Sequence, residues 1–245
     1  MPWDFWLIFL FFAVILPWRG RSRLKKLLEK AHVGTAERLS LYASTIAFQW
    51  ASVAVVGWRA WAHGYTLSEM GLVIDWRMRM GIMLAAVLGA TILAAGQWFN
   101  LRRMGRLSSP RGAILQALAD RIFPQSSVEL LPYFALAVTA GVCEEFLYRG
   151  FAMAVLARAG LPPWSVVLFS AILFGLAHIY QGRGGFVSTL VIGTVFGTAR
   201  IAYYSLVPVI TWHVAVDVVA GIAGPRYLSR KPQTPSAVEI QPRGH

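Results

Sequence analysis

Six residues of this sequence carry groups suited to acid–base chemistry and lie within, or directly beside, long apolar runs. They are Glu144, Glu145, Arg149, His178, His213 and Asp217. A charged side chain at the centre of a membrane helix costs about 2.5 to 3.5 kcal/mol even on lenient insertion scales. Such groups persist when they pair with one another or line a wet cavity walled by protein. We therefore treat the six as a candidate functional site.

Their spacing predicts which of them share a helix face. Glu145 and Arg149 are four residues apart, so on a helix they can pair, which leaves Glu144, about 100° away, free for another task. His213 and Asp217 are also four apart, so Asp217 can orient or charge-tune the imidazole. Each pair alone is also common as structural packing. However, a carboxylate and two imidazoles on separate apolar helices need polar partners inside the protein, so we expect one shared site.

Two chemistries fit this set, and both hydrolyse an acyl bond. In the first, Glu144 is the general base on a water that His178 positions, while His213 and Asp217 stabilise the oxyanion; Asp217 would need a proton to donate directly. In the second, Glu144, His178 and His213 ligate a divalent metal such as zinc. The first needs no cofactor. Neither HExxH nor HxxEH occurs in the sequence, so the common zinc-protease signature is absent.

Composition predicts the class of fold that positions these residues. Of 245 residues, 57% are hydrophobic and 14% charged, against about 25% charged in soluble domains. We predict an all-α, polytopic transmembrane helix bundle of about seven helices, with eight as the alternative count. The apolar runs are Trp3–Trp18, Leu39–Trp58, Met80–Phe99, Leu130–Phe151, Trp164–Ile179, Phe186–Tyr204 and Leu206–Ala223. The single cysteine, Cys143, excludes an intrachain disulfide.

Charge distribution predicts the topology. The net charge of +12 comes from basic residues in the segments between runs, which fits the positive-inside pattern rather than nucleic-acid binding. Alternate loops are basic, so we expect the N-terminus outside and the C-terminus in the cytoplasm. We expect one transmembrane domain over residues 1–224, with its motif-bearing core at 128–224, and a polar, disordered cytoplasmic tail at 225–245. Residue counting puts His178 and His213 ~10 Å apart in depth unless a helix tilts or breaks near 182–185.

The motifs resemble those of a known family. Glu144-Glu145-x-x-x-Arg149, Phe174-x-x-x-His178 and His213-x-x-x-Asp217 occur in the order, and on the separate helices, of the CPBP (CAAX protease and bacteriocin-processing, Abi) intramembrane proteases, which include Rce1-type prenyl-protein endopeptidases. The resemblance covers roughly residues 130–224. It implies an endopeptidase in which Glu144 and His178 activate water, and His213 and Asp217 stabilise the oxyanion. The family's last motif position is Asn or Asp.

The resemblance also implies partners and a location. We expect contact with membrane lipid, a membrane-associated or prenylated peptide or protein substrate, and no nucleic acid. The expected location is integral to a bacterial cytoplasmic membrane. Two alternatives remain open: a catalytically silent immunity or scaffold protein in the membrane, or a transporter in which Glu144, Arg149 and Asp217 form a proton or ion relay. A relay would spread these groups along a path, whereas hydrolysis needs them around one water-sized space.

Overall fold

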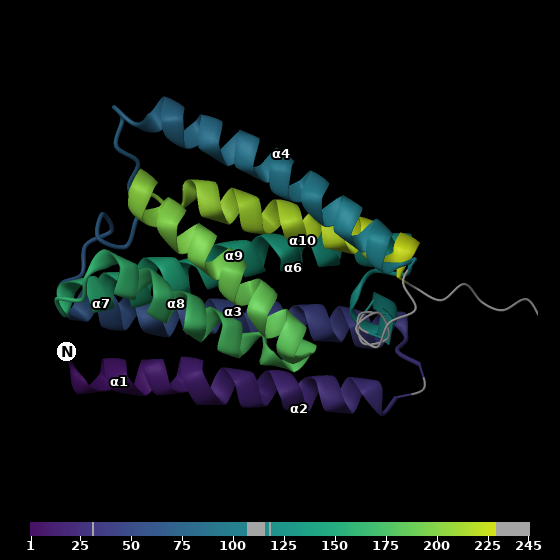
Figure 1. Ribbon diagram of the computed structural model, residues 1–245. Coiled ribbons are helices and arrows are strands. Elements are labelled where there is room, and N and C mark those ends of the chain that lie inside the picture. Colours follow the sequence, from purple (N-terminus) through teal and green to yellow (C-terminus); the bar gives the residue numbers. More distant parts are fainter. Residues whose placement is uncertain (31, 107–115, 118, 229–245) are drawn as a thin grey trace, which may run out of the picture.

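The structure is a computed structural model that describes residues 1–30, 32–106, 116, 117 and 119–228 (Figure 1). All regular structure in this part of the chain is helical, and no strand occurs there. The predicted all-α helix bundle is confirmed.

Seven helical segments run back and forth through the bundle, and three of them contain irregular turns. The first joins α1 (Trp3–Leu10), a π-helical turn (Phe11–Ile15) and α2 (Leu16–Leu28). Next come α3 (Thr35–Ala62) and α4 (Arg79–Met104). The fourth joins α6 (Ser127–Glu145), a π-helical turn (Phe146–Ala152) and α7 (Met153–Arg158). The last three are α8 (Pro163–Ala177), α9 (Gly182–Tyr203) after a 3₁₀ turn (Ile179–Gln181), and α10 (Val207–Tyr227).

Each of the seven predicted apolar runs coincides with one of these segments. Six segments are long and apolar enough to cross a membrane. The exception is α8, which has 15 residues and extends only about 22 Å, less than the ~30 Å hydrocarbon core. Because six full spans are present, the chain is an integral membrane protein.

Two predicted boundaries were too early. The first helix continues beyond Trp18 to Leu28, so the basic residues that follow the first apolar run are helical. The last helix continues through Pro225 to Tyr227, whereas the tail was predicted to begin at Pro225. A proline this close to a helix end disturbs only the final turn, and Leu228 is buried with Leu101 against α4. Residues 229–245 of the predicted tail lie outside the described residues.

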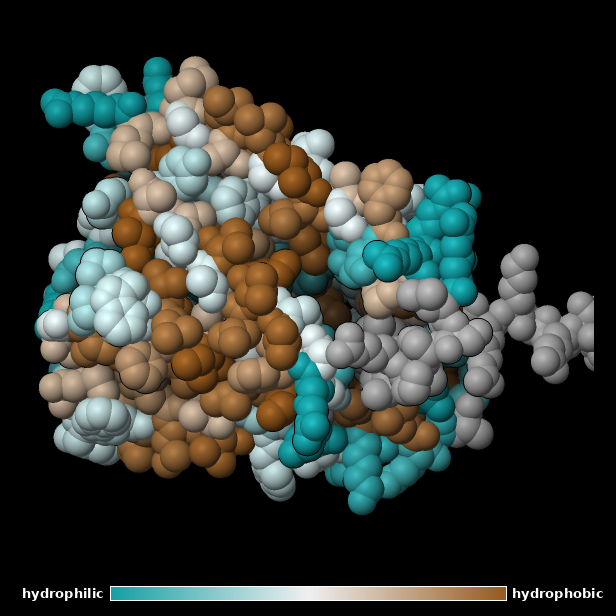
Figure 2. Space-filling view, in the orientation of Figure 1, coloured by the Kyte–Doolittle hydropathy of each residue, from teal (hydrophilic) through white to brown (hydrophobic). Residues whose placement is uncertain are grey.

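Packing brings the motif-bearing helices together. α6 lies between α3 and α10, α10 also packs along α4, and α8 packs against α9, which crosses the bundle obliquely (Figure 1). Gly141 permits the close approach of α6 to α10, because a Cβ there would lie 2.5 Å from Val214 Cγ2. Hydrophobic residues cover the middle of the surface in Figure 2, and hydrophilic residues gather toward the ends of the bundle.

Candidate active site

Glu144, near the end of α6, has one carboxylate oxygen fixed and the other without a partner. Gln49 of α3 donates a hydrogen bond from Nε2 to Glu144 Oε1 at 2.8 Å. Glu144 Oε2 is buried and has no hydrogen-bond partner among the described residues. It lies 3.8 Å from His178 Nε2 and 4.0 Å from His213 Nε2. A buried carboxylate oxygen normally has a partner, so this position is suited to a water molecule.

Glu145, the next residue, is committed to two other partners. Arg149 Nη1 donates to Glu145 Oε1 at 2.9 Å, as the four-residue spacing predicted, and both side chains are fully buried. The same oxygen accepts from His213 Nδ1 at 2.8 Å. Arg149 lies in the π-helical turn that follows α6, and such turns are frequent at functional sites. Its guanidinium also stacks 4.2 Å from the centroid of the Phe174 ring.

His178 stands where α8 ends rather than within a continuous helix. It is the C-cap residue, and a 3₁₀ turn and the left-handed Gly182 (φ 82°) follow it. Its Nδ1 lies 2.8 Å from the Phe174 carbonyl oxygen, which can only accept, so Nδ1 carries the proton. In the neutral ring Nε2 is therefore a lone-pair acceptor facing Glu144. An offset of ~10 Å from His213 does not separate the two imidazoles, because both Nε2 atoms lie within 4.0 Å of Glu144 Oε2. The helix breaks at 178–182, beside the segment 182–185 where a break was considered.

His213 and Asp217 share a face of α10, but Asp217 is not what orients the imidazole. His213 Nε2 lies 3.6 Å from Asp217 Oδ2, too long for a good hydrogen bond. The orienting contact is that of Nδ1 with Glu145, across the α6–α10 interface. The Asp217 side chain keeps 32% of its surface exposed, and Tyr133 donates to its backbone carbonyl at 3.0 Å. The structure thus assigns the orientation of His213 to Glu145, and the other expected role of Asp217, tuning the charge of the imidazole, stays a prediction.

All six predicted residues come together in one continuous set of contacts of 4.0 Å or less. They converge on one point rather than spreading along a path, as a transport relay would require. Sequence reasoning missed Gln49, which contacts Glu144 from α3. The available signal was an amide in the otherwise apolar run Leu39–Trp58.

The proposed metal ligands do not fit an ion as they are arranged. Among the residues that the structure describes, no group of three His, Cys, Asp or Glu side chains is placed to hold a metal. Zinc bonds of about 2.0–2.2 Å put tetrahedral donors roughly 3.4 Å apart. Glu144 Oε2 lies 3.8 and 4.0 Å from the two imidazole nitrogens. We therefore assign no catalytic step to a metal.

Comparison with known proteins finds a match, which covers the part of the chain that carries the motifs. Residues 126–219 match the family model described as Type II CAAX prenyl endopeptidase Rce1-like. This part of the chain resembles the Rce1-like family. The Rce1-like segment contains all six predicted site residues, and the resemblance stated from the motifs is confirmed. At family level, the match supports a CAAX-type intramembrane protease. Gln49 lies outside the matched segment. No curated protein and no solved structure matches the chain.

Proposed function

We propose that the chain is an intramembrane endopeptidase that hydrolyses a peptide bond with water activated by Glu144. One observation carries the proposal: Glu144 Oε2 is buried without a described partner and lies within 4.0 Å of two imidazole nitrogens from α8 and α10. A water within hydrogen-bond distance of Oε2 also reaches His178 Nε2. That is the geometry that general-base catalysis requires.

Gln49 and His178 determine how this water is held. Gln49 binds Oε1 of Glu144, so Oε2 is the oxygen directed at the water. His178 donates through Nδ1 to the Phe174 carbonyl, so its Nε2 accepts from the water. The water then donates one hydrogen to Glu144 and the other to His178. Its lone pairs are left facing the substrate carbonyl.

In the reaction, Glu144 accepts one proton from water and later gives it to the leaving amine. The water oxygen attacks the carbonyl carbon while Glu144 takes a proton, giving a tetrahedral oxyanion. His213 donates to this oxyanion through Nε2 while Nδ1 donates to Glu145. Asp217, in its protonated form, is the second donor. The C–N bond then breaks, Glu144 returns its proton to the leaving amine, and carboxylic acid and amine products result.

The surroundings favour a substrate that lies at the membrane. Glu144 keeps 20% and Asp217 32% of side-chain surface exposed, so a chain can reach the polar groups. The walls are aromatic: Phe174 lies 4.5 Å from His178 and Phe196 6.3 Å from His213, centroid to centroid. Together with the Rce1-like match, this supports a membrane-associated or prenylated peptide as the substrate class. The predicted orientation, with the N-terminus outside and the C-terminus in the cytoplasm, is part of this proposal.

The test is cleavage by the purified chain in lipid vesicles of a farnesylated peptide and of the same peptide without the lipid. Glu144→Gln keeps the side-chain shape and removes the base, so the cleavage rate should fall by about 10²–10⁴-fold. Glu29→Gln, at the exposed glutamate that caps the C-terminal end of α2, is the matched control and should cleave like the wild type. Equal rates for Glu144→Gln and wild type would refute the proposal. Elemental analysis of the active protein, with and without chelator, tests the metal alternative.

A further inference from the structure

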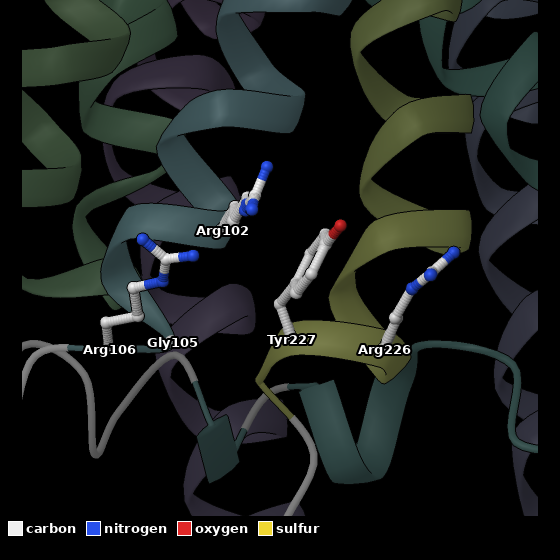
Figure 3. Close-up of a pocket in the computed structure, with 5 residues that line it drawn as sticks. All are labelled: Arg102, Gly105, Arg106, Arg226 and Tyr227. Carbon is white, nitrogen blue, oxygen red and sulfur yellow. The ribbon is translucent and has the colours of Figure 1, made fainter.

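A basic cavity lies at the C-terminal ends of α4 and α10, and none of the catalytic candidates lines it. It has a volume of about 460 Å³. Its described lining residues are Arg102, Gly105, Arg106, Arg226 and Tyr227, which include three arginines and no acid (Figure 3). All three arginines are exposed. The six catalytic candidates take no part in this cavity.

Close helix packing brings the arginines together. Gly105 follows α4 and lies against the end of α10, since a Cβ there would be 2.2 Å from the Tyr227 carbonyl oxygen. Leu101 and Ala223 are buried where the two helices meet. Trp98 packs edge-on against the Tyr227 ring, with centroids 5.5 Å apart. Arg102 and Arg226 therefore project from two packed helices, and Arg106 projects from the turn that follows α4.

The chemistry of the lining favours a phosphate group. A guanidinium presents paired N–H donors that match phosphate oxygens, and it binds them more strongly than neutral donors do. The Tyr227 side chain stands between Arg102 and Arg226 in Figure 3, so its hydroxyl is available as a further donor. Three cations without an acid among the described lining residues also attract an anion electrostatically.

The neighbouring surface identifies a lipid as the source of that phosphate. Trp98 and Tyr227 are of the residue types that concentrate at the level of membrane headgroups. Phe99, three residues before Arg102, is 64% exposed, and Ile222, four residues before Arg226, is 47% exposed. Each lies on the face of its helix that carries the arginine, one turn toward the apolar middle. An acyl chain could lie along these residues with its headgroup in the cavity.

We propose that this cavity binds the phosphate headgroup of an anionic phospholipid. The site is independent of the proposed peptidase function. It gives α4 and α10 a shared lipid ligand at the ends of the helices. The residue His213 is on α10, so a bound lipid would also hold one of the helices that carry the catalytic groups.

Native mass spectrometry of the full chain, released from detergent with added phosphatidylglycerol or phosphatidylcholine, tests the proposal. Wild type should bind phosphatidylglycerol more tightly than phosphatidylcholine, and excess inorganic phosphate should not displace it. At ~1 kcal/mol per basic residue, Arg102→Gln with Arg226→Gln should raise Kd for phosphatidylglycerol by about 10- to 30-fold. The control Arg77→Gln with Arg79→Gln removes two exposed arginines near the start of α4 and should leave Kd within about twofold.

Three results would overturn the proposal. One is unchanged Kd in the Arg102/Arg226 double variant. Another is equal weakening in both double variants, which would mean a general effect of net charge. The third is full displacement by inorganic phosphate, which would make free phosphate the ligand. Thermal unfolding without added lipid should be the same for both double variants, because exposed substitutions usually change stability by less than about 0.5 kcal/mol.

Discussion

The two adjacent glutamates should respond in opposite ways to the same substitution. Glu145 is fully buried and holds Arg149 at 2.9 Å and His213 Nδ1 at 2.8 Å. Within the described part of the chain, Glu144 has no arginine partner, and its one partner at hydrogen-bond distance is the neutral amide of Gln49. We expect Glu145→Gln to lower stability strongly and Glu144→Gln to abolish cleavage while leaving stability almost unchanged.

The magnitude follows from the buried ion pair. Removing one partner of such a pair costs about 3–5 kcal/mol, because the other charge stays buried without compensation. In a chain of this size each kcal/mol shifts the unfolding temperature by about 2–4 °C, so Glu145→Gln should unfold about 6–20 °C below the wild type. Glu144→Gln leaves Arg149 with its partner Glu145, so we expect its unfolding temperature to lie within about 2 °C of the wild type.

A double-mutant cycle separates pairing from packing. Arg149→Met removes the guanidinium, which stacks on Phe174, and keeps an unbranched apolar side chain of similar length. Combined with Glu145→Gln, it leaves no buried charge unpaired at this position, so the double variant should be more stable than the sum of the single losses predicts. The assay is thermal unfolding in one fixed detergent, followed by helical circular dichroism, with cleavage of the farnesylated peptide measured in parallel.

Three outcomes would contradict the different roles of Glu144 and Glu145. If Glu145→Gln unfolds at the wild-type temperature, Arg149 does not depend on Glu145. If the two single losses add fully in the double variant, the two residues are not coupled. If Glu144→Gln destabilises as much as Glu145→Gln, Glu144 is a structural group rather than a free base.

Three further predictions concern the groups around this pair. Gln49→Leu removes the donor that holds Glu144. It should lower the cleavage rate by about 10- to 100-fold without lowering the unfolding temperature. The control Gln97→Leu removes an amide from α4 and should leave the cleavage rate and the unfolding temperature unchanged. Asp217→Asn should retain kcat within about tenfold, because an amide N–H can donate to the oxyanion without prior protonation of the side chain. Asp217→Ala has no donor, so its kcat should fall further than that of Asp217→Asn. In the 63–78 loop, the hydrogen bond from Arg158 lowers the pKa of Glu69 to about 2, so its stabilisation is present above the usual pKa and is lost as pH falls toward 2. The drop in unfolding temperature between neutral and strongly acidic pH should therefore be smaller in Glu69→Gln.

Much of the fold could be predicted because a membrane imposes it. Apolar runs long enough to span the hydrocarbon core form helices, and all seven runs did so. The sequence did not allow us to predict the residue at which a helix with a polar end stops. Arg19 to Lys26 continue α2 because the helical backbone extends into water without penalty, and hydropathy alone marks only the apolar part. The end of α8 at Ala177 could likewise not be predicted from hydropathy, because it depends on how the neighbouring helices pack.

In the site, local spacing predicted local pairs and failed for contacts between helices. The Glu145–Arg149 pair follows from four-residue spacing and is present. The same rule predicted that Asp217 orients or charge-tunes His213, and the orienting contact comes instead from Glu145 of another helix. Gln49 was missed for a similar reason: its partner, Glu144, is 95 residues away in sequence. Such contacts depend on helix packing, which here includes the close approach at Gly141.

The choice of partners for the two glutamates has a chemical consequence. Arg149 and His213 Nδ1 both donate to Glu145 Oε1, so this carboxylate orients the imidazole. The uncharged amide of Gln49 fixes Glu144 through Oε1, and Glu144 Oε2 lies within 4.0 Å of the Nε2 atoms of His178 and His213. In the proposed mechanism, one cation and one amide thus divide two identical side chains into a positioning group and a base.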